Sequence, residues 1–258
     1  SALALGRYSY RNARAISEQS ERSLAESTRT LGEAMQERLD NFIIDSDRAL
    51  IHIVDLERLK EFSTRWTQIV RLSQAVEAAI VLDDKQHIVK DGYVSRQSPE
   101  EKKQFQELFL YDILPELKLE ELQLEQHRHL HQVVHGKDYL ISYIRREQEA
   151  TASHPRQTYY VVLKISIDYL LKDIFPHEFE KLLGRELFAI LDENGRVVFG
   201  EKVRAPRKLL YEQTFPTTLY LWRLQMAPPD AERLAAEARK RGLYDSTLVI
   251  AMLAVLLV

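Results

Sequence analysis

The sequence predicts an α+β fold in which a long N-terminal helix precedes two antiparallel sheet units in tandem. The first observation behind this prediction is a stretch almost free of helix breakers. From about residue 14 to residue 56 there is no proline and only Gly32, and apolar residues recur at spacings of three and four or their sums. A helix of roughly 40 residues reaches about 60 Å, so it must pack along more than one unit or pair with a copy of itself. The apolar positions of this helix are Leu31, Met35, Leu39, Phe42, Ala49 and Ile53.

The second observation is an internal repeat. The segments VLDDKQHIV (residues 81–89) and ILDENGRVV (residues 190–198) align without a gap on the pattern [VI]-L-D-[DE]-x-x-[HR]-[IV]-V. Each segment is typical of a strand, a tight polar turn and a second strand, and Asn194-Gly195 is a strong hairpin signal. Two unrelated acidic turns are the simpler alternative, because Asp-rich turns are common. The similar order of elements after each copy favours a true repeat.

The segments after each hairpin complete the two sheets. A largely helical insertion at residues 98–125 follows the first hairpin, and a helix at residues 59–76 precedes it. A linking helix that starts near residue 167 is expected to break at Pro176. Trp222 is expected to fill the core of the smaller second unit. The further strand candidates are residues 127–135, 138–145 and 158–165 after the first copy, and residues 208–215 and 219–226 after the second.

Composition and motifs exclude several function classes. With 36 basic and 39 acidic residues and a net charge of -3, the chain has no global attraction to nucleic acid. The absence of cysteine excludes disulfides, thiolate zinc sites and cysteine nucleophiles. No G-x-S-x-G, P-loop, H-E-x-x-H or dinucleotide fingerprint is present. We therefore expect no enzymatic activity and no cofactor in this part of the protein, with a membrane-anchored enzyme of unrecognised type as the remaining alternative.

Both ends of the chain are apolar. From Ser246 the sequence reads STLVIAMLAVLLV, which suits the first part of a membrane-spanning helix; a buried core helix is the alternative. The N-terminal SALALG is compatible with the tail of an earlier membrane helix, a signal segment or a cloning remnant. The basic residues beside both ends would favour a cytoplasmic location, but that rule weakens for loops longer than about 60 residues. The two ends together indicate a domain between two membrane helices.

This order of elements resembles the double Cache (tandem PAS-like) sensor module. That module lies outside the membrane in bacterial sensor histidine kinases, chemoreceptors and cyclic-di-nucleotide enzymes. The resemblance implies a periplasmic domain of an inner-membrane receptor that binds an unknown small molecule, forms a homodimer through the long helix and signals through an exit helix. A histidine kinase is the leading interpretation. The alternatives are a chemoreceptor, a cyclic-di-nucleotide enzyme, or an ectodomain that recognises a protein partner without a small ligand.

The resemblance also implies a division of the chain. The predicted parts are residues 1–76, mainly a signalling and dimerisation helix; residues 77–168, a membrane-distal sensor unit; residues 169–186, a linking helix; residues 187–229, a smaller membrane-proximal unit; and residues 230–258, an exit helix with the start of a membrane helix. Ligand binding is expected in the larger, membrane-distal unit.

Candidate ligand-binding residues lie in that larger unit. The guanidinium of Arg96 could hold a carboxylate, or it could be solvated in a loop. The Trp-Tyr type pair that follows the equivalent arginine in amino-acid-binding members is absent here. Tyrosines of this unit could line a cavity or simply pack in the core. The predicted set is Tyr93, Arg96, Tyr111, His129, His131, Tyr139, Ser142 and Tyr143.

Four of the eight histidines fall within residues 127–135. If this strand and the next form a hairpin around a two-residue loop, His129 and His131 share a face with Ser142. His129 and His131 could converge on one metal ion, whereas His127 and His131 are about 13 Å apart. No metal is predicted, because further donors would have to come from residues 98–125. A pH-sensitive or ligand-contacting face and a solvated polar face are the alternatives.

The opposite face of the same hairpin is more apolar, and we therefore expect it to pack on the long helix. Its residues are Leu130, Val134, Tyr139, Ile141 and Tyr143.

Overall fold

The computed structural model describes residues 2–150, 155–182, 186–231, 233 and 236. It contains a long N-terminal helix and two antiparallel sheets, so the α+β prediction is confirmed. The chain forms two compact units. The five-stranded unit comprises residues 37–178 and 215–221, and the four-stranded unit comprises residues 1–36, 179–214 and 222–258. This division assigns the long helix to both units, whereas the sequence was divided with residues 1–76 as a separate part.

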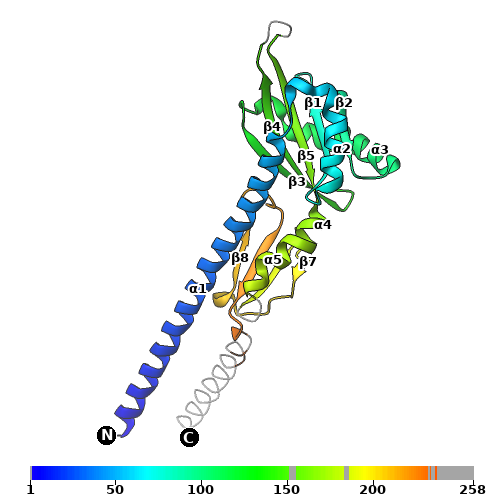
Figure 1. The fold of residues 1–258 in the computed structure, drawn as a ribbon. Helices are drawn as coiled ribbons and strands as arrows, with labels where there is room; N and C mark the ends of the chain where they lie inside the picture. Colours follow the sequence, from blue (N-terminus) through cyan, green and yellow to red (C-terminus); the bar gives the residue numbers. More distant parts are fainter. Residues whose placement is uncertain (1, 151–154, 183–185, 232, 234–235, 237–258) are drawn as a thin grey trace. The chain divides into compact units, whose positions relative to one another are not determined.

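Helix α1 (Ala2–His52) is continuous through residues 36 and 37, where its assignment changes from one unit to the other (Figure 1). Met35 and Leu39 are buried as predicted, but Phe42 is only partly buried, Ala49 is exposed and Ile53 is 47% exposed. The buried stripe is rotated from the expected one because it includes polar side chains as well as apolar ones. The buried residues of this helix include Thr28, Met35, Gln36, Leu39, Asp40, Ile43, Asp47 and Ile51.

The larger sheet has the strand order β2-β1-β5-β4-β3, and every neighbouring pair is antiparallel. The three strands predicted between residues 127 and 165 are all present. The hairpin of β3 and β4 turns at His135-Gly136, and His129 lies opposite Ser142, as the predicted register requires. The strands are β1 (Val76–Leu82), β2 (Ile88–Ser95), β3 (His127–Val134), β4 (Lys137–Gln148) and β5 (Gln157–Ile165).

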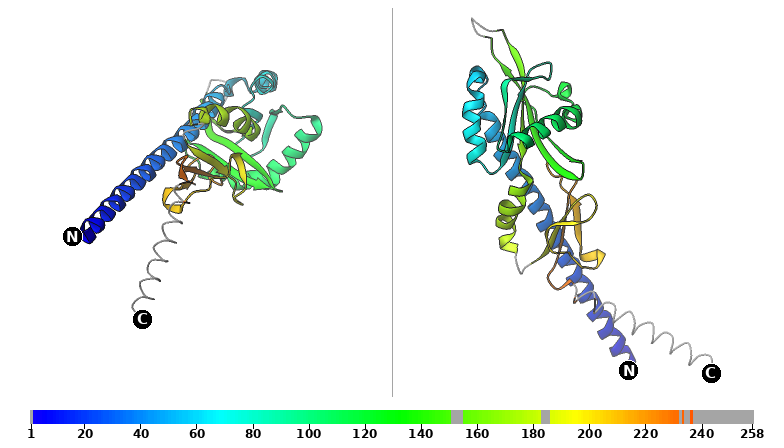
Figure 2. Two further views of the ribbon diagram at one scale, coloured as in Figure 1. Left: turned by 90° about the horizontal axis from the view of Figure 1, so that it is seen from below. Right: turned by 90° about the vertical axis from the view of Figure 1, so that its right-hand side faces the viewer.

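Helical segments cover both faces of this sheet (Figure 2). Helix α2 (Phe62–Leu72), preceded by η1 (Leu56–Glu61), lies on one face, and helix α3 (Pro99–Leu108) lies on the other. Helix α3 begins with a capping box, in which the Ser98 hydroxyl accepts from the Glu101 N–H and the Glu101 carboxylate accepts from the Ser98 N–H. The insertion continues as η2 (Phe109–Ile113), η3 (Leu114–Leu117) and η4 (Leu119–Glu121).

The packing predicted for the two faces of the β3–β4 hairpin was wrong. The apolar face does not pack on α1 but joins one core cluster with Phe105, Phe109 and Ile113 of the insertion. The histidine face meets α1 instead, where His129 contacts Asp47. The physical reason is that the buried stripe of α1 contains carboxylates, which need polar partners, while the insertion offers an apolar surface. The hairpin residues in the apolar cluster are Val134, Tyr139, Ile141 and Tyr143, with Leu130 packed against it.

The predicted linking helix is present but does not break at Pro176. It consists of α4 (Ile167–Tyr169), η5 (Leu170–Ile174), α5 (Phe175–Phe179) and η6 (Glu180–Leu182). The π-helical turn η5 ends directly before α5, whose second residue is Pro176. Proline has no backbone N–H to donate. The wider π-helical turn directly before α5 lets the helix continue through Pro176 without that hydrogen bond.

The smaller sheet has the strand order β7-β6-β9-β8. Its last two strands are shorter than predicted, because residues 207–209 form a 3-10 turn before β8 and residues 219–222 form a bend and a turn before β9. Trp222 is buried, as expected. Within this unit, Gln36 of α1 accepts a hydrogen bond from the Tyr211 hydroxyl (2.6 Å) and donates to the carbonyl of Gln213 (2.8 Å). The elements are β6 (Leu187–Leu191), β7 (Val197–Gly200), η7 (Arg207–Leu209), β8 (Tyr211–Thr214) and β9 (Arg223–Ala227).

Gly32 allows helix α1 to approach the Tyr211 ring in the same unit. A Cβ atom at this position would lie 2.4 Å from two ring carbons. The single glycine in the predicted helix therefore serves close packing, and it does not end the helix.

The repeated hairpins have the same hydrogen bonds. In the first, the Asp83 carboxylate accepts from the N–H groups of Lys85 (3.0 Å) and His87 (2.8 Å). In the second, the Asp192 carboxylate accepts from those of Asn194 (2.9 Å) and Arg196 (2.8 Å). The fourth loop residue has positive φ in both copies, Gln86 (64°) and Gly195 (78°). The sequence repeat is therefore a structural repeat, built on an aspartate that caps its own turn.

Residues 230–258, the predicted exit helix and start of a membrane helix, lie almost entirely outside the described residues. Among the residues that are described, no helix combines the length and the apolar character needed to cross a bilayer.

Removing the capping aspartate of the first hairpin should destabilise the protein. We expect Asp83→Ala to lower the free energy of unfolding by about 1–2 kcal/mol, because two backbone N–H groups lose their acceptor. The neighbouring exposed Asp84 supplies the matched control, and Asp84→Ala should change this free energy by less than about 0.5 kcal/mol. Urea unfolding followed by circular dichroism measures both, and equal losses would contradict the role of Asp83.

Candidate functional site

A cavity of about 480 Å³ lies in the five-stranded unit, between α3 and the adjacent ends of β4 and β5. From α3 and η2 it is lined by polar and apolar side chains, among them Glu101, Phe105 and Tyr111. From the sheet it is lined by Tyr139 and Lys164. Tyr111 and Tyr139 are the two residues of the predicted ligand-binding set that this cavity brings together.

Lys164 is a buried cation in the wall of this cavity. Its side chain is 5% exposed, and its Nζ lies 2.6 Å from a carboxylate oxygen of Glu77. The same Nζ lies 4.5 Å from the ring centroid of Phe105 and 5.3 Å from that of Tyr139. Burial lowers the pKa of Lys164, and the Glu77 carboxylate opposes this shift. One carboxylate and two aromatic faces thus hold the ammonium group next to the cavity.

Further charges of both signs surround the cavity. Lys137, at the start of β4, places its Nζ 5.8 Å from the Tyr139 ring centroid. Glu107 and Asp112 contribute carboxylates from the α3–η2 side. Hydrogen bonds from Ser98 lower the pKa of Glu101, so this carboxylate is ionised at neutral pH. A small polar molecule can therefore find partners for an anionic group and for donor groups in one cavity.

Three other residues of the predicted set lie outside this cavity. Tyr93 and Tyr143 belong to the apolar core cluster. The Tyr93 hydroxyl donates to the carbonyl of Lys102 (3.0 Å), and burial raises the pKa of Tyr93 to about 12. Arg96 donates to the carbonyls of Ser73 (3.2 Å) and Gln74 (3.4 Å), so its guanidinium fixes the loop between α2 and β1.

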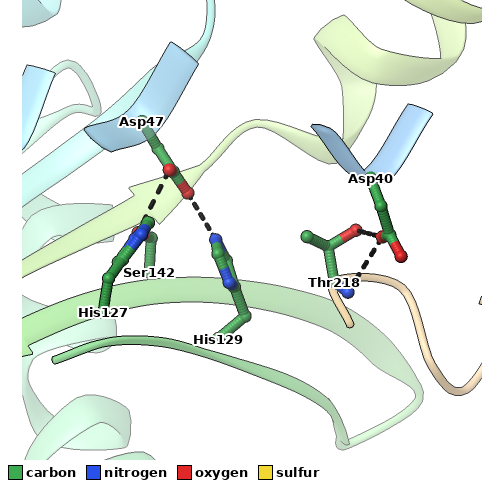
Figure 3. A network of polar contacts seen from close by, with 6 residues as sticks. All are labelled: Asp40, Asp47, His127, His129, Ser142 and Thr218. Atoms are coloured by element: carbon green, nitrogen blue, oxygen red, sulfur yellow. Dashed lines mark hydrogen bonds and ion pairs between the residues drawn. The ribbon is translucent and has the colours of Figure 1, made fainter. Parts of the chain in front are cut away.

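The remaining predicted residues belong to the histidine face. His127, His129 and Ser142 form a buried polar cluster with Asp47 of α1 (Figure 3). His129 Nε2 lies 2.6 Å from Asp47 Oδ2, and His127 Nε2 lies 3.4 Å from Asp47 Oδ1. His127 Nε2 also lies 2.7 Å from the Ser142 hydroxyl. The side chains of Asp47, His127 and His129 are 2%, 5% and 2% exposed. This cluster is shielded from solvent, and both of its imidazoles contact the carboxylate of Asp47.

Burial determines the protonation of His127. Desolvation lowers its pKa to about 4, with Asp47 opposing the shift and His129, Arg48 and His52 adding to it. His127 is therefore a neutral imidazole at pH 7.

His131 has different partners from His129. Its Nδ1 accepts from the Leu221 N–H (3.3 Å), so its Nε2 carries the proton and donates to Asp138 Oδ1 (3.2 Å). Its backbone N–H donates to the Tyr220 hydroxyl (2.9 Å). The sequence paired His129 with His131 as candidate metal ligands, whereas the structure joins His129 with His127.

Sequence reasoning missed Asp47 and Lys164, although each left a signal. Asp40 and Asp47 are seven residues apart and therefore lie on one face of α1. The Asp40 carboxylate accepts a hydrogen bond from the N–H group of Thr217 (3.1 Å). It also accepts from the N–H group (3.0 Å) and the hydroxyl of Thr218 (Figure 3). Lys164 is the single charge in the apolar run YYVVLKI, where an ionised side chain requires a partner.

Neither family models nor curated proteins match this sequence. Three solved domains are among the structures that are similar to the chain. The periplasmic domain of LuxQ from Vibrio cholerae has a TM-score of 0.46 and 11% identity over 79% of this chain and 99% of the other. The ligand-binding domain of the Pseudomonas fluorescens chemoreceptor CtaA, in complex with L-serine, has a TM-score of 0.41 and 11% identity over 82% and 97%. The extracellular domain of the putative histidine kinase vpHK1S-Z8 has a TM-score of 0.35 and 10% identity over 86% and 97%.

The depressed pKa of His127 should make stability depend on pH. Because the folded chain binds this proton more weakly than the unfolded chain, the free energy of unfolding falls as the pH decreases from about 7 towards 4. Between pH 7 and pH 5, we expect this group to contribute a loss of about 2 kcal/mol. Urea unfolding at both pH values, in the presence of a chelator, measures the loss in the parent and in His127→Gln. The variant should lose about 2 kcal/mol less.

The exposed His87 provides the control for this measurement, since His87→Gln should show the full loss of the parent. An identical pH dependence in the parent and in His127→Gln would contradict the assignment.

Proposed function

We propose that this chain is the extracytoplasmic ligand-sensing domain of a bacterial transmembrane receptor. The observation that supports it most directly is the cavity beside α3, with the buried Lys164 in its wall. Its volume of about 480 Å³ lies within the usual range of small-molecule sites, roughly 300–1,000 Å³. A buried, charged side chain in the wall of a cavity is a candidate for contact with a ligand, so the position of Lys164 favours a binding role.

The charges around the cavity favour a small polar ligand that bears a carboxylate. Lys137 and Lys164 can pair with its anionic group, while Glu101 and Asp112 can accept from its hydroxyl or ammonium groups. Tyr111, which is 79% exposed, and Tyr139 provide aromatic surface and hydroxyl groups at the same cavity.

Signal transmission would use helix α1. The helix is continuous from Ala2 to His52 and contributes residues to both units. A ligand that binds one of two helix arrangements more tightly shifts their populations by its difference in affinity. In our proposal two copies associate along α1, and the receptor is anchored by the apolar C-terminal segment. The output domain would be a histidine kinase, with a chemoreceptor or a cyclic-di-nucleotide enzyme as the alternative.

Ligand binding should depend on Lys137. We expect at least one small carboxylate, in a panel of carboxylates, amines and polyols, to raise the thermal unfolding midpoint of the purified chain. Lys137→Ala should weaken the affinity for that carboxylate about tenfold or more, because it removes a charge-assisted contact. Isothermal titration calorimetry measures the affinity. Lys137 is exposed, so its removal should leave the fold unchanged.

Lys103 is the matched control, since it is an exposed lysine of α3 outside the cavity lining. Lys103→Ala should bind like the parent. Equal affinity in all three proteins would contradict the proposed site. No stabilisation by any compound would favour the alternative that a protein partner, and not a small molecule, controls this domain.

A further inference from the structure

We infer that Asp47, His127 and His129 form a binding site for a divalent transition-metal ion of the Zn²⁺ class. Within the described residues, these three side chains are a group whose ligand atoms all lie within 4.8 Å of one another. The site is on the histidine face of the sheet, and it does not depend on the proposed cavity ligand.

The distances between the ligand atoms suit a metal ion. Zinc bonds of about 2.0–2.1 Å place neighbouring ligand atoms of a tetrahedral site roughly 3.3 Å apart. The distances from the Asp47 carboxylate, 3.4 Å from Oδ1 to His127 Nε2 and 2.6 Å from Oδ2 to His129 Nε2, lie on either side of that value. Both imidazoles direct the same nitrogen, Nε2, towards the carboxylate (Figure 3). Small ring movements would therefore complete three ligands of a tetrahedral site.

An unsatisfied atom also points to a ligand. Asp47 Oδ1 is buried and accepts no hydrogen bond, although a buried carboxylate oxygen without a donor costs free energy. The nearest imidazole, His127, makes its hydrogen bond with Ser142 at 2.7 Å. A cation between Asp47, His127 and His129 would satisfy Oδ1 directly.

Ser142 offers a further oxygen donor beside these ligands, because its hydroxyl lies 2.7 Å from His127 Nε2.

The donor set determines which metals would bind. Two imidazoles and one carboxylate suit Zn²⁺, Co²⁺ or Ni²⁺, whereas Mg²⁺ prefers oxygen ligands alone. The ligating form of histidine is the neutral imidazole.

Such a metal would connect helix α1 to the sheet, because Asp47 belongs to α1 and both histidines belong to β3. It would fix the distance between these two elements of the five-stranded unit, and thereby stabilise the packing of α1 against the histidine face.

Zinc titration of the chelator-treated chain tests this inference. We expect one Zn²⁺ per chain by calorimetry and a thermal midpoint that rises by roughly 5 °C or more at a 100-fold excess over Kd. Co²⁺ should produce a visible absorption band that Zn²⁺ abolishes, while Mg²⁺ should have no effect. Asp47→Asn and His127→Ala/His129→Ala should each weaken zinc binding at least tenfold.

The matched control is His87→Ala/His177→Ala, which removes two exposed histidines and should bind zinc like the parent. If the cluster variants fail to fold, imidazole NMR of the parent provides the readout. One equivalent of Zn²⁺ should shift the signals of His127 and His129 and leave those of the other histidines unchanged. Absence of binding, equal affinity in the cluster and control variants, or shifts spread over all histidines would overturn the inference.

Discussion

The burial of polar side chains along helix α1 is the constraint on which the arrangement of the five-stranded unit depends. Asp40 and Asp47 are 3% and 2% exposed, and a buried carboxylate is tolerated only where donors surround it. Asp40 finds the backbone N–H groups of Thr217 and Thr218, and Asp47 finds the imidazoles of β3. These contacts select which face of the sheet meets α1. The apolar face of the hairpin consequently packs on the insertion, where Phe105 and Phe109 belong to the same core cluster.

Local sequence patterns were sufficient to predict most of the strands and the pairing within the β-hairpins. Alternation of side chains between two faces predicted the register of the β3–β4 hairpin, and the repeated aspartate predicted the two β-hairpins. These local patterns could not predict which face of the β3–β4 hairpin packs on which helix. That choice depends on Asp47, which is 82 residues away from His129 in the sequence. Hydrophobic periodicity was misleading for Phe42 and Ala49 for the same reason, since polar residues occupy the buried stripe.

The candidate cavity was only partly predictable for a related reason. Tyr111 and Tyr139 could be proposed because aromatic residues in the larger unit are natural cavity residues, and both do line the cavity. Lys164 could not be interpreted, because its partner Glu77, on the adjacent strand β1, is far away in the sequence and the rings beside it come from α3 and β4. Arg96 was interpreted as a ligand contact, but its guanidinium binds backbone carbonyls of a neighbouring loop. A single sequence does not distinguish a charge that holds a loop from one that holds a ligand.

Lys164 and the cluster of Asp47, His127 and His129 lie on opposite faces of the larger sheet. Lys164 pairs in register with Ile141 on the cavity face, and the next pair, Leu163 and Ser142, lies on the histidine face. A shift of β4 that changes the surroundings of Lys164 therefore also changes those of His127 through Ser142. If occupancy of the cavity and of the histidine cluster both alter this strand, the two equilibria are coupled, and the coupling is reciprocal in free energy. A proton or metal ion bound at the cluster would then change the affinity of the cavity for its ligand by a certain factor. The ligand in the cavity would change the affinity of the cluster for that proton or metal ion by the same factor.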